Sequence, residues 1–244
     1  MKNIKGNLSE LLLISKLQWR LASVIPSHTQ RQVLLGKLRE ISKNVSCPHN
    51  ESEILIVGLE ILSIPKDKEG CIVEAGVYKG GSTSKLSLFC KLANKELIAF
   101  DSFRGIPENK EKHVKSMLGH SLEGWFAGGT WAGSLDEVKK NVARYGEIGI
   151  CTFVEGWFEN TMSSFKDKIA LAYLDVDLAS STRACLKYLY PLIIPGGILY
   201  SQDGDIPLVA EVFRDERFWE AEVGFNMPDI ENLGKKIIKV VKNV

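Results

Sequence analysis

The sequence predicts an α/β fold in which a mostly parallel, twisted sheet carries helices on both faces. From residue 71 onward, short apolar strand patterns alternate with amphipathic helical patterns. A glycine-rich turn follows the first of these strands, and acidic residues directly follow several later ones. Because the carboxyl ends of parallel strands meet at one edge of a sheet, where ligands bind, the functional site is expected at that edge.

Composition excludes several classes of protein. The 244 residues suffice for one large domain, or for one domain with an appendage. With 31 basic and 30 acidic residues the net charge is +1, which gives no electrostatic case for nucleic acid or a membrane as the partner. No apolar run reaches the roughly 18 residues of a membrane span. The 5 cysteines form no Cys-x-x-Cys pair and favour reduced thiols, so a cytoplasmic location is expected.

Residues 1–65 are expected to form a helical extension that precedes the α/β domain of residues 66–244. The broad apolar stripes of this extension are consistent both with packing on the main domain and with burial in a homodimer or higher homo-oligomer. Three helices are predicted to begin at capping-box patterns, which are Asn7-x-x-Glu10, Thr29-x-x-Gln32 and Asn50-x-x-Glu53.

The elements of the main domain follow in order. One helix is expected over 83–93 and another from Ser134 to Arg144, and a third begins near Pro207. Residues 102–131 are rich in glycine, charge and aromatic rings but lack periodicity, which indicates a lid beside the site. Strands are predicted at 71–73, 97–100, 150–154, 169–174, 198–201 and 236–241, the last at a sheet edge because it ends the chain.

The turn after the first strand, EAGVYKGGS, indicates a ligand. Glycine lets the backbone approach a ligand closely, although a tight turn without a ligand would look similar. Asp101, at the end of the next strand, is placed to accept hydrogen bonds from ribose hydroxyls. An NAD fingerprint would need Gly-x-Gly-x-x-Gly, whereas here the acid Glu74 precedes a different glycine spacing. A carboxylate suits the cationic S-adenosylmethionine, so methyl transfer is favoured over hydride transfer.

Acidic residues also follow two neighbouring strands. Asp175 and Asp177 come after 169–174, and Gln202 and Asp203 come after 198–201. Carboxylates gathered at one sheet edge point to a hard metal ion and a general base. A purely structural alternative is that Asp175 and Asp177 cap the helix that follows them.

Several motifs together resemble one known family. They are VEAGVYKGGST, FDSFRGIPE, SLDEVKKNVARYG, VEGWFENT, YLDVDLASS and PGGILYSQDG, in this order across about residues 70–215. The combination resembles the macrocin O-methyltransferase (TylF-type) family of S-adenosylmethionine-dependent sugar O-methyltransferases. The resemblance implies a Rossmann-like class I methyltransferase fold, S-adenosylmethionine, Mg²⁺ and an acceptor hydroxyl on a sugar or glycosylated small molecule. It also implies oligomers built partly through N-terminal helices.

The resemblance further implies roles for single residues. Asp177 becomes the general base, and Asp175, Gln202 and Asp203 become metal positions. The cofactor contacts it implies, together with those read from the turn, are Glu74, Ala75, Gly76, Val77, Gly80, Gly81, Ser82, Asp101, Ser102, Phe103, Ser134, Gly156, Trp157 and Asp175.

Gln202 departs from the family pattern, which has a second aspartate at this position. An amide oxygen can bind Mg²⁺ but brings no negative charge, so metal affinity is expected to fall unless Asp205 supplies a carboxylate. Two other hypotheses are a non-catalytic or metal-independent relative and an NAD-dependent oxidoreductase on a similar fold. His113 and His120, in the lid segment, are interpreted as solvated loop histidines, and His49 as structural.

Overall fold

A seven-stranded sheet forms the centre of the molecule, with strand order β3-β2-β1-β4-β5-β7-β6. The computed structural model describes residues 4–243, and of residues 4–11 it describes the backbone alone. Strands β1 to β5 run parallel, while β7 is antiparallel to β5 and β6 is antiparallel to β7. The chain reverses its direction of travel through the sheet between β3 and β4, so β1 lies beside β4. The predicted α/β class is confirmed.

Apolar and β-branched runs form the strands, and segments with apolar residues at helical spacing form the helices. The strands are β1 (Cys71–Ala75), β2 (Leu97–Asp101), β3 (Cys151–Glu155), β4 (Ile169–Leu174), β5 (Ile193–Ser201), β6 (Ile230–Glu231) and β7 (Ile238–Val241). The α-helices are α1 (Ile4–Val24), α2 (His28–Asn44), α3 (Glu51–Ser63), α4 (Gly81–Ala93), α5 (Leu135–Tyr145), α6 (Phe158–Thr161), α7 (Ala179–Leu189), α8 (Pro207–Arg214) and α9 (Glu216–Phe218). Short helical turns lie at Ile148–Ile150, Met162–Ser164, Tyr190–Leu192 and Trp219–Val223.

The predicted strands agree with the observed ones to within a few residues, except in the position of the last. The prediction that this strand lies at a sheet edge is wrong, because β7 lies between β5 and the two-residue strand β6. The chain turns back at residues 232–235, and this turn lets β6 cover the outer side of β7. Strand β7 begins at Ile238, so Lys236 precedes it and is free of the sheet ladder.

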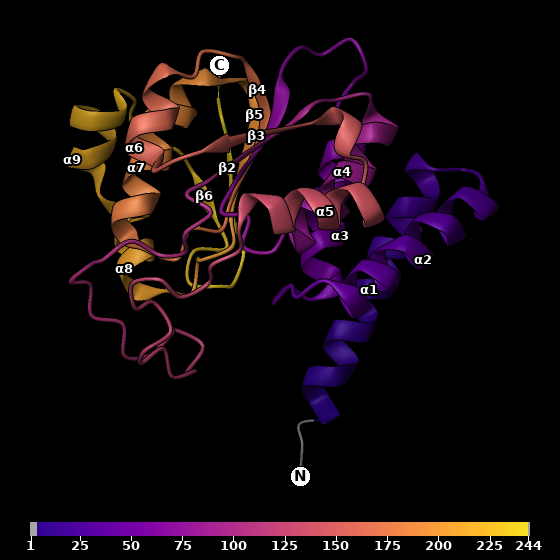
Figure 1. Ribbon diagram of the computed structural model, residues 1–244, viewed down its shortest axis with the longest axis horizontal. Helices are drawn as coiled ribbons and strands as arrows, with labels where there is room; N and C mark the ends of the chain where they lie inside the picture. Colours follow the sequence, from indigo (N-terminus) through magenta and orange to yellow (C-terminus); the bar gives the residue numbers. More distant parts are fainter. Residues whose placement is uncertain (1–3, 244) are drawn as a thin grey trace.

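Helices cover both faces of the sheet (Figure 1). One face carries α7 and α8, whose apolar residues share a core with β4 and β5 around Leu186, Val209 and Phe213. The other face carries α3 and α4, and Leu55 and Phe89 are fully buried between them and the strands. Helices α1 and α2 pack outside α3 and α4, and their buried leucines belong to the same cluster. The N-terminal helices therefore extend one core of the α/β domain.

The starts of these first helices differ in part from the sequence prediction. Helix α1 begins at Ile4, so Asn7 lies inside the helix, and the side chains of Asn7 and Glu10 are outside the described residues. Helix α2 begins at His28, and Ser27 caps it by accepting a hydrogen bond from the Gln30 amide. The third prediction is confirmed, since the Glu53 carboxylate accepts a 2.8 Å hydrogen bond from the Asn50 backbone N–H.

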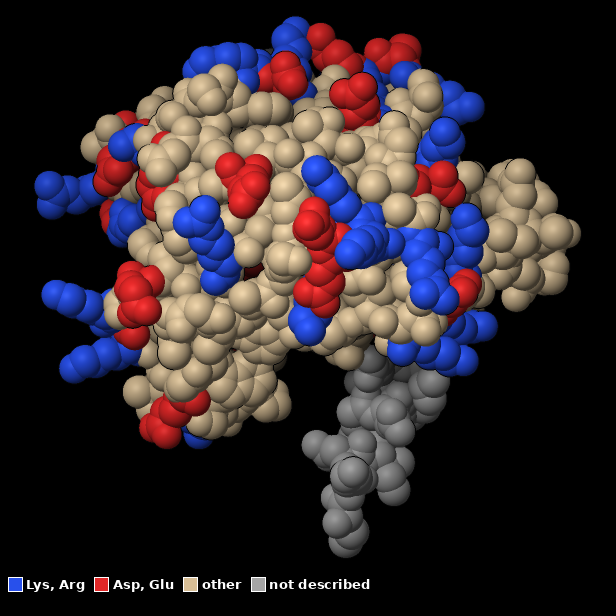
Figure 2. Space-filling model, in the orientation of Figure 1, with Lys and Arg blue, Asp and Glu red and all other residues tan. Residues whose placement is uncertain are grey.

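Charged side chains of both signs are interspersed over the face drawn in Figure 2, in keeping with the balanced composition. A single-sign field that would attract a polyanion is absent from that face. Within residues 4–243, no helix is long and apolar enough to cross a membrane.

Gly76 permits the close approach of the first and fourth strand ends. Its φ is +87°, and an added Cβ would lie 1.9 Å from the Asp175 carbonyl oxygen. Both the left-handed backbone and the contact therefore exclude a side chain at this position. The carboxyl ends of β1 and β4, and hence the groups that follow them, are held together by this glycine.

Gly76→Ala is expected to lower the free energy of unfolding by more than about 2 kcal/mol, through the positive φ and the clash with the β4 backbone. Urea unfolding measures the effect. Gly36→Ala is the matched control, because a Cβ at Gly36 in helix α2 meets nothing within 4 Å. That change should leave stability equal or raise it by up to about 1 kcal/mol. Equal stabilities of the two variants would contradict the proposed role of Gly76.

Candidate active site

A cavity of about 330 Å³ opens at the carboxyl ends of β1, β2 and β4. One end lies against the glycine turn and the Gly156-Trp157 segment, and the other end contains acidic side chains. Residues 46–49, which connect α2 to α3, line the cavity, and residues of the 102–131 segment line it as well. The cavity therefore brings the glycine turn and an acidic end together, as the edge position of the motifs predicts.

The glycine turn is held in shape by Asp101. One carboxylate oxygen accepts hydrogen bonds from the Val77 and Tyr78 amides at 2.6 and 3.4 Å, and the other accepts from the Phe103 amide at 2.7 Å. Burial raises the pKa of Asp101, although these hydrogen bonds lower it in part. Asp101 lines the cavity, so its position is compatible with the predicted contact to a ribose, which stays a prediction.

Glu74 lies fully buried in β1, beneath the turn. Neither of its carboxylate oxygens has a hydrogen-bond partner among the described residues. Burial raises the pKa of this carboxyl to about 7. A buried acid beside the cavity favours a cationic ligand over a pyrophosphate, because a second negative charge there would add repulsion.

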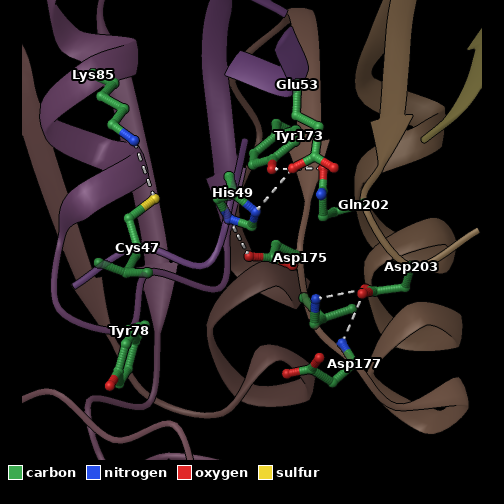
Figure 3. A network of polar contacts seen from close by, with 12 residues as sticks. Cys47, His49, Glu53, Tyr78, Lys85, Tyr173, Asp175, Asp177, Gln202 and Asp203 are labelled. Atoms are coloured by element: carbon green, nitrogen blue, oxygen red, sulfur yellow. Dashed lines mark hydrogen bonds and ion pairs between the residues drawn. The ribbon is translucent and has the colours of Figure 1, made fainter. Parts of the chain in front are cut away.

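At the acidic end, the residues that follow β4 are hydrogen-bonded to Asp203, which follows β5 (Figure 3). Oδ2 of Asp203 accepts hydrogen bonds from the Val176 and Asp177 amides, each at 3.0 Å. Asp177 itself adopts a left-handed backbone with φ +62°. Such a conformation costs a non-glycine residue about 1 kcal/mol or more and is common at functional sites.

The acids perturb one another's titration. Burial and then the charges of Asp203 and Asp175 raise the pKa of Asp177 well above its ordinary value. Burial and the charge of Asp175 raise the pKa of Asp203 to about 7. Carboxyls with raised pKa values in a cleft are candidates for proton transfer. Of the two, Asp177 lines the cavity and Asp203 does not.

His49 meets the acidic end from the N-terminal segment. Its Nε2 lies 2.9 Å from Oδ2 of Asp175, and its Nδ1 lies 3.9 Å from a Glu53 oxygen. The His49 side chain is only 4% exposed. Burial alone would lower the pKa of His49, but the charge and hydrogen bond of Asp175 outweigh it, so the pKa is raised.

Lys236 reaches the same end of the cavity from the segment before β7. Its Nζ lies 3.8 Å from Oδ1 of Asp205, a carboxylate that is 6% exposed. Burial lowers the pKa of Lys236, but the nearby charges of Asp203, Asp205 and Asp175 raise it by more. The pKa is therefore above its ordinary value, and the ammonium form is favoured. Two basic side chains therefore face the acidic residues.

The predicted metal ligands do not form a set that fits Mg²⁺. Gln202 is fully buried and its amide oxygen accepts a 3.1 Å hydrogen bond from the Tyr173 hydroxyl, away from the cavity. Asp175 points toward His49, and one oxygen of Asp203 is taken by two amides (Figure 3). Mg²⁺ needs several convergent oxygens in octahedral geometry. Among residues 4–243, no group of three or more acidic, histidine or cysteine side chains could hold a metal.

The 102–131 segment is fastened to helix α7 by Glu111. Its two oxygens accept hydrogen bonds from the Ala179 and Ser180 amides, both at 2.9 Å. These amides open the helix, and its N-cap residue Leu178 supplies no side-chain cap. The alternative that Asp175 and Asp177 cap this helix is therefore wrong, because a carboxylate from the loop takes that role.

Aromatic rings and histidines shape the same segment. Trp131 donates from its ring nitrogen to the Trp125 carbonyl at 2.9 Å and packs edge-on against Tyr78. Trp125 lines the cavity and is 52% exposed. The interpretation of His113 as a solvated histidine is wrong, because its side chain is 4% exposed, contacts Glu111 at 3.2 Å and packs on Phe126. His120 is exposed, as predicted.

Most of the residues predicted to bind cofactor lie at the cavity, but some do not. The cavity is lined by Gly76, Val77, Gly81, Ser82, Asp101, Ser102, Gly156, Trp157 and Asp175. Glu74, Ala75, Gly80, Phe103 and Ser134 are not among its lining residues. Ser134 caps helix α5 by accepting a hydrogen bond from the Glu137 amide, and Phe103 packs in a small core with Val77 and Val138.

Sequence reasoning missed His49, Glu111 and Lys236. No strand or turn motif precedes His49, which follows Cys47-Pro48 in the connection to a helix. Lys236 belongs to an alternating Lys/Ile/Val run that is typical of a solvated strand face. Only the β6–β7 turn, which the pattern does not reveal, directs this lysine toward the acidic end.

The strand order, the antiparallel β7 and the glycine turn at the first strand define a Rossmann-like methyltransferase fold. Over 79% of this chain and 80% of the other, the structure resembles that of the O-methyltransferase NovP, with a TM-score of 0.62 at 21% identity. It also resembles the calicheamicin methyltransferase CalS11, with a TM-score of 0.54 at 17% identity over 99% of this chain and 94% of the other. These likenesses establish the fold.

A comparison of the sequence with protein-family models identifies the family. The family model described as macrocin-O-methyltransferase (TylF) matches residues 62–232. The chain belongs to this family, which confirms the resemblance seen in the motifs.

Two curated relatives are O-methyltransferases by name. The 8-demethyl-8-(2,3-dimethoxy-alpha-L-rhamnosyl)-tetracenomycin-C 4'-O-methyltransferase of Streptomyces olivaceus is 32% identical over 157 residues, 61% of this chain and 58% of that protein. The demethyldecarbamoylnovobiocin O-methyltransferase of Streptomyces niveus is 29% identical over 142 residues, 55% of this chain and 52% of that protein. The chain thus matches somewhat more than half the length of each.

Glu111→Ala should lower the free energy of unfolding at pH 7 by about 1 kcal/mol, the value of a lost helix cap. Burial by itself raises the pKa of Glu111, but the hydrogen bonds from Ser180 and Ala179 outweigh it and lower the pKa. A lowered folded-state pKa means that the contribution is complete above the unfolded-state value of about 4.3 and is lost as the pH falls through the folded-state value.

The difference between wild type and Glu111→Ala should therefore shrink below about pH 4. Denaturant unfolding between pH 3 and pH 7 measures it. Glu123→Ala, in an exposed part of the same loop, is the control and should change stability little at any pH. A difference that stays constant down to pH 3 would show that the Glu111 carboxylate does not cap α7.

Proposed function

We propose that the protein transfers a methyl group from S-adenosylmethionine to a hydroxyl of a sugar or glycosylated small molecule. One observation carries the proposal: Asp177, a carboxyl with a raised pKa and a left-handed backbone, lines the same cavity as the glycine turn. The names of the two curated relatives, both O-methyltransferases and one acting on a rhamnosyl compound, support this substrate class.

In this proposal the cofactor lies along the β1–β2 side of the cavity. Gly76 and Gly81 let the backbone approach the methionine end, and the buried Glu74 carboxyl favours the cationic groups of the cofactor. Asp101 would accept from the ribose while it holds the turn, and Trp157 would lie near the adenine. The sulfonium methyl would then face the acidic end.

Asp177 would act as the general base. A sugar hydroxyl has a pKa near that of water, about 16, so its oxygen attacks only as its proton leaves. The oxygen forms a bond to the methyl carbon, the carbon–sulfur bond breaks with its electrons going to sulfur, and the hydroxyl proton goes to Asp177. Alignment of the two substrates would supply much of the rate, and the aromatic residues of the 102–131 segment that line the cavity would orient the acceptor.

Mg²⁺, which the family resemblance implies, takes no part in this proposed reaction. The amide of Gln202 is bound to Tyr173, and Asp175 is paired with His49. Oδ1 of Asp203 is buried without a hydrogen-bond partner among the described residues, but this oxygen without a ligand from Gln202 falls short of the octahedral set that Mg²⁺ needs.

The proposed quaternary state is a homo-oligomer built through the N-terminal helices. Trp19 on α1 is 75% exposed, and Leu12 and Val33 are also exposed on α1 and α2. Exposed apolar groups gathered on one helical layer are typical of an interface.

Asp177→Asn is expected to lower kcat by about 10²- to 10⁴-fold, because the amide cannot accept the hydroxyl proton. Binding of the cofactor, measured by calorimetry, should stay within a few-fold of wild type because Asp177 lies at the acidic end. Asp167→Asn, an exposed change before β4, is the control and should leave both quantities unchanged. Full turnover by Asp177→Asn would remove the base from the proposal.

S-Adenosylmethionine and S-adenosylhomocysteine should each raise the melting temperature with increasing concentration, while NAD should not. A ligand at about 100 times its Kd stabilises the folded state by about 2.7 kcal/mol. Differential scanning fluorimetry with the three compounds measures the effect. Stabilisation by NAD alone would favour an oxidoreductase instead.

A further inference from the structure

The acidic end of the cavity carries more negative charge than one base requires. Asp175, Asp177, Asp203 and Asp205 all lie at the ends of β4 and β5 or just after them. The last two are nearly completely buried, at 1% and 4% exposure. Buried carboxylates need compensating positive charge or protons.

Two basic side chains of the protein, His49 and Lys236, lie beside these carboxylates. Nε2 of His49 lies 2.9 Å from Oδ2 of Asp175, and the Lys236 ammonium lies 3.8 Å from Oδ1 of Asp205. Both residues line the cavity, and neither belongs to a strand of the sheet.

Two further observations are consistent with side chains of the protein occupying the place of a metal ion. Gln202 removes one negative charge from the cluster and is bound to Tyr173 rather than aimed at the carboxylates. At 3.8 Å the Lys236 ammonium makes no hydrogen bond to Asp205, and Oδ1 of Asp205 has no hydrogen-bond partner within residues 4–243. The lysine side chain is also 46% exposed. Its N–H donors are therefore available to an oxygen atom in the cavity.

We propose that His49 and Lys236 take the place of a divalent metal at this site, with His49 neutralising Asp175 and Lys236 contacting the acceptor oxygen. The contact with the acceptor rests on the proposed methyl transfer, whereas the lack of metal binding does not.

The chemistry is that of a fixed cation beside a developing alkoxide. As the acceptor O–H bond breaks, its proton goes to Asp177 and negative charge grows on the oxygen that attacks the methyl group. Lys236 keeps its own protons and donates a hydrogen bond to that oxygen. A donor placed where charge develops contributes about 10²- to 10³-fold to a rate.

Metal binding is tested directly by Mn²⁺ titration of chelator-treated protein, followed by electron paramagnetic resonance of the free ion. Wild type should bind no stoichiometric Mn²⁺ at micromolar concentrations. The double variant Gln202→Asp, Lys236→Gln removes a cation and restores a carboxylate, so it should bind Mn²⁺ at least about tenfold more tightly. Circular dichroism establishes whether this variant is folded. If it is not, Lys236→Gln alone is titrated and is expected to bind more tightly than wild type.

The neighbouring Lys235 provides a matched control, because it is exposed and its Nζ bonds Asn232. Lys235→Gln should leave Mn²⁺ binding as in wild type. One equivalent of Mn²⁺ bound by wild type, or equal affinities for wild type and the folded Lys236 variants, would overturn the proposal.

Methyl transfer provides the second arm, with the acceptor identified from a panel of nucleotide sugars and glycosides. Chelator should leave the wild-type rate unchanged, and Lys236→Gln should lower kcat by about 10²-fold while Lys235→Gln does not. A chelator-sensitive wild-type rate would overturn the proposal. Absence of turnover with every acceptor would instead count against the proposed function, and the Mn²⁺ result would still decide the metal question.

Discussion

The two hydrogen bonds from the Val176 and Asp177 amides to Asp203 organise the acidic end of the cavity. They join the carboxyl end of β5 to the carboxyl end of β4 at the point where the chain leaves the sheet. Asp177 has a left-handed backbone there, and its amide can donate to Asp203 in that conformation. The position of the proposed base therefore depends on a carboxylate that does not itself line the cavity. A buried acceptor bound by two donors is a rigid support, because breaking either bond leaves a buried group unsatisfied.

The same arrangement explains how the acids divide their roles. Asp203 supports the loop, Asp175 pairs with His49, and Asp177 faces the cavity. Three carboxylates that look equivalent in the pattern thus differ in their partners, and the partners come from distant parts of the chain. The Glu111 carboxylate adds a fourth role, since it supplies the helix cap that the strand-end acids do not.

Sequence reasoning predicted the sheet well, because strand periodicity and glycine turns are local signals. Strand β4 was predicted to the residue, and Ser134 was placed at the start of α5. The motifs also led to the edge of the sheet where the cavity lies. Partners that depend on tertiary packing left no local signal. His49 reaches Asp175 only because the N-terminal helices pack on the sheet, and Lys236 faces the acids only because the β6–β7 turn precedes β7. Gln202 stood out as a departure from the family pattern, but its partner Tyr173 could not be read from spacing.

The segment between α2 and α3 lies directly on the glycine turn. A Cβ at Gly81 would meet the Cβ of Cys47 at 2.6 Å, and Cys47 and His49 both line the cavity. Part of the cavity wall beside the glycine turn therefore belongs to the connection between two of the N-terminal helices. A ligand that contacts this wall is expected to stabilise the packing of those helices, and thermodynamic linkage makes such a coupling equal in both directions. Binding of a ligand in the cavity and packing of the N-terminal helices on the sheet are therefore expected to strengthen each other.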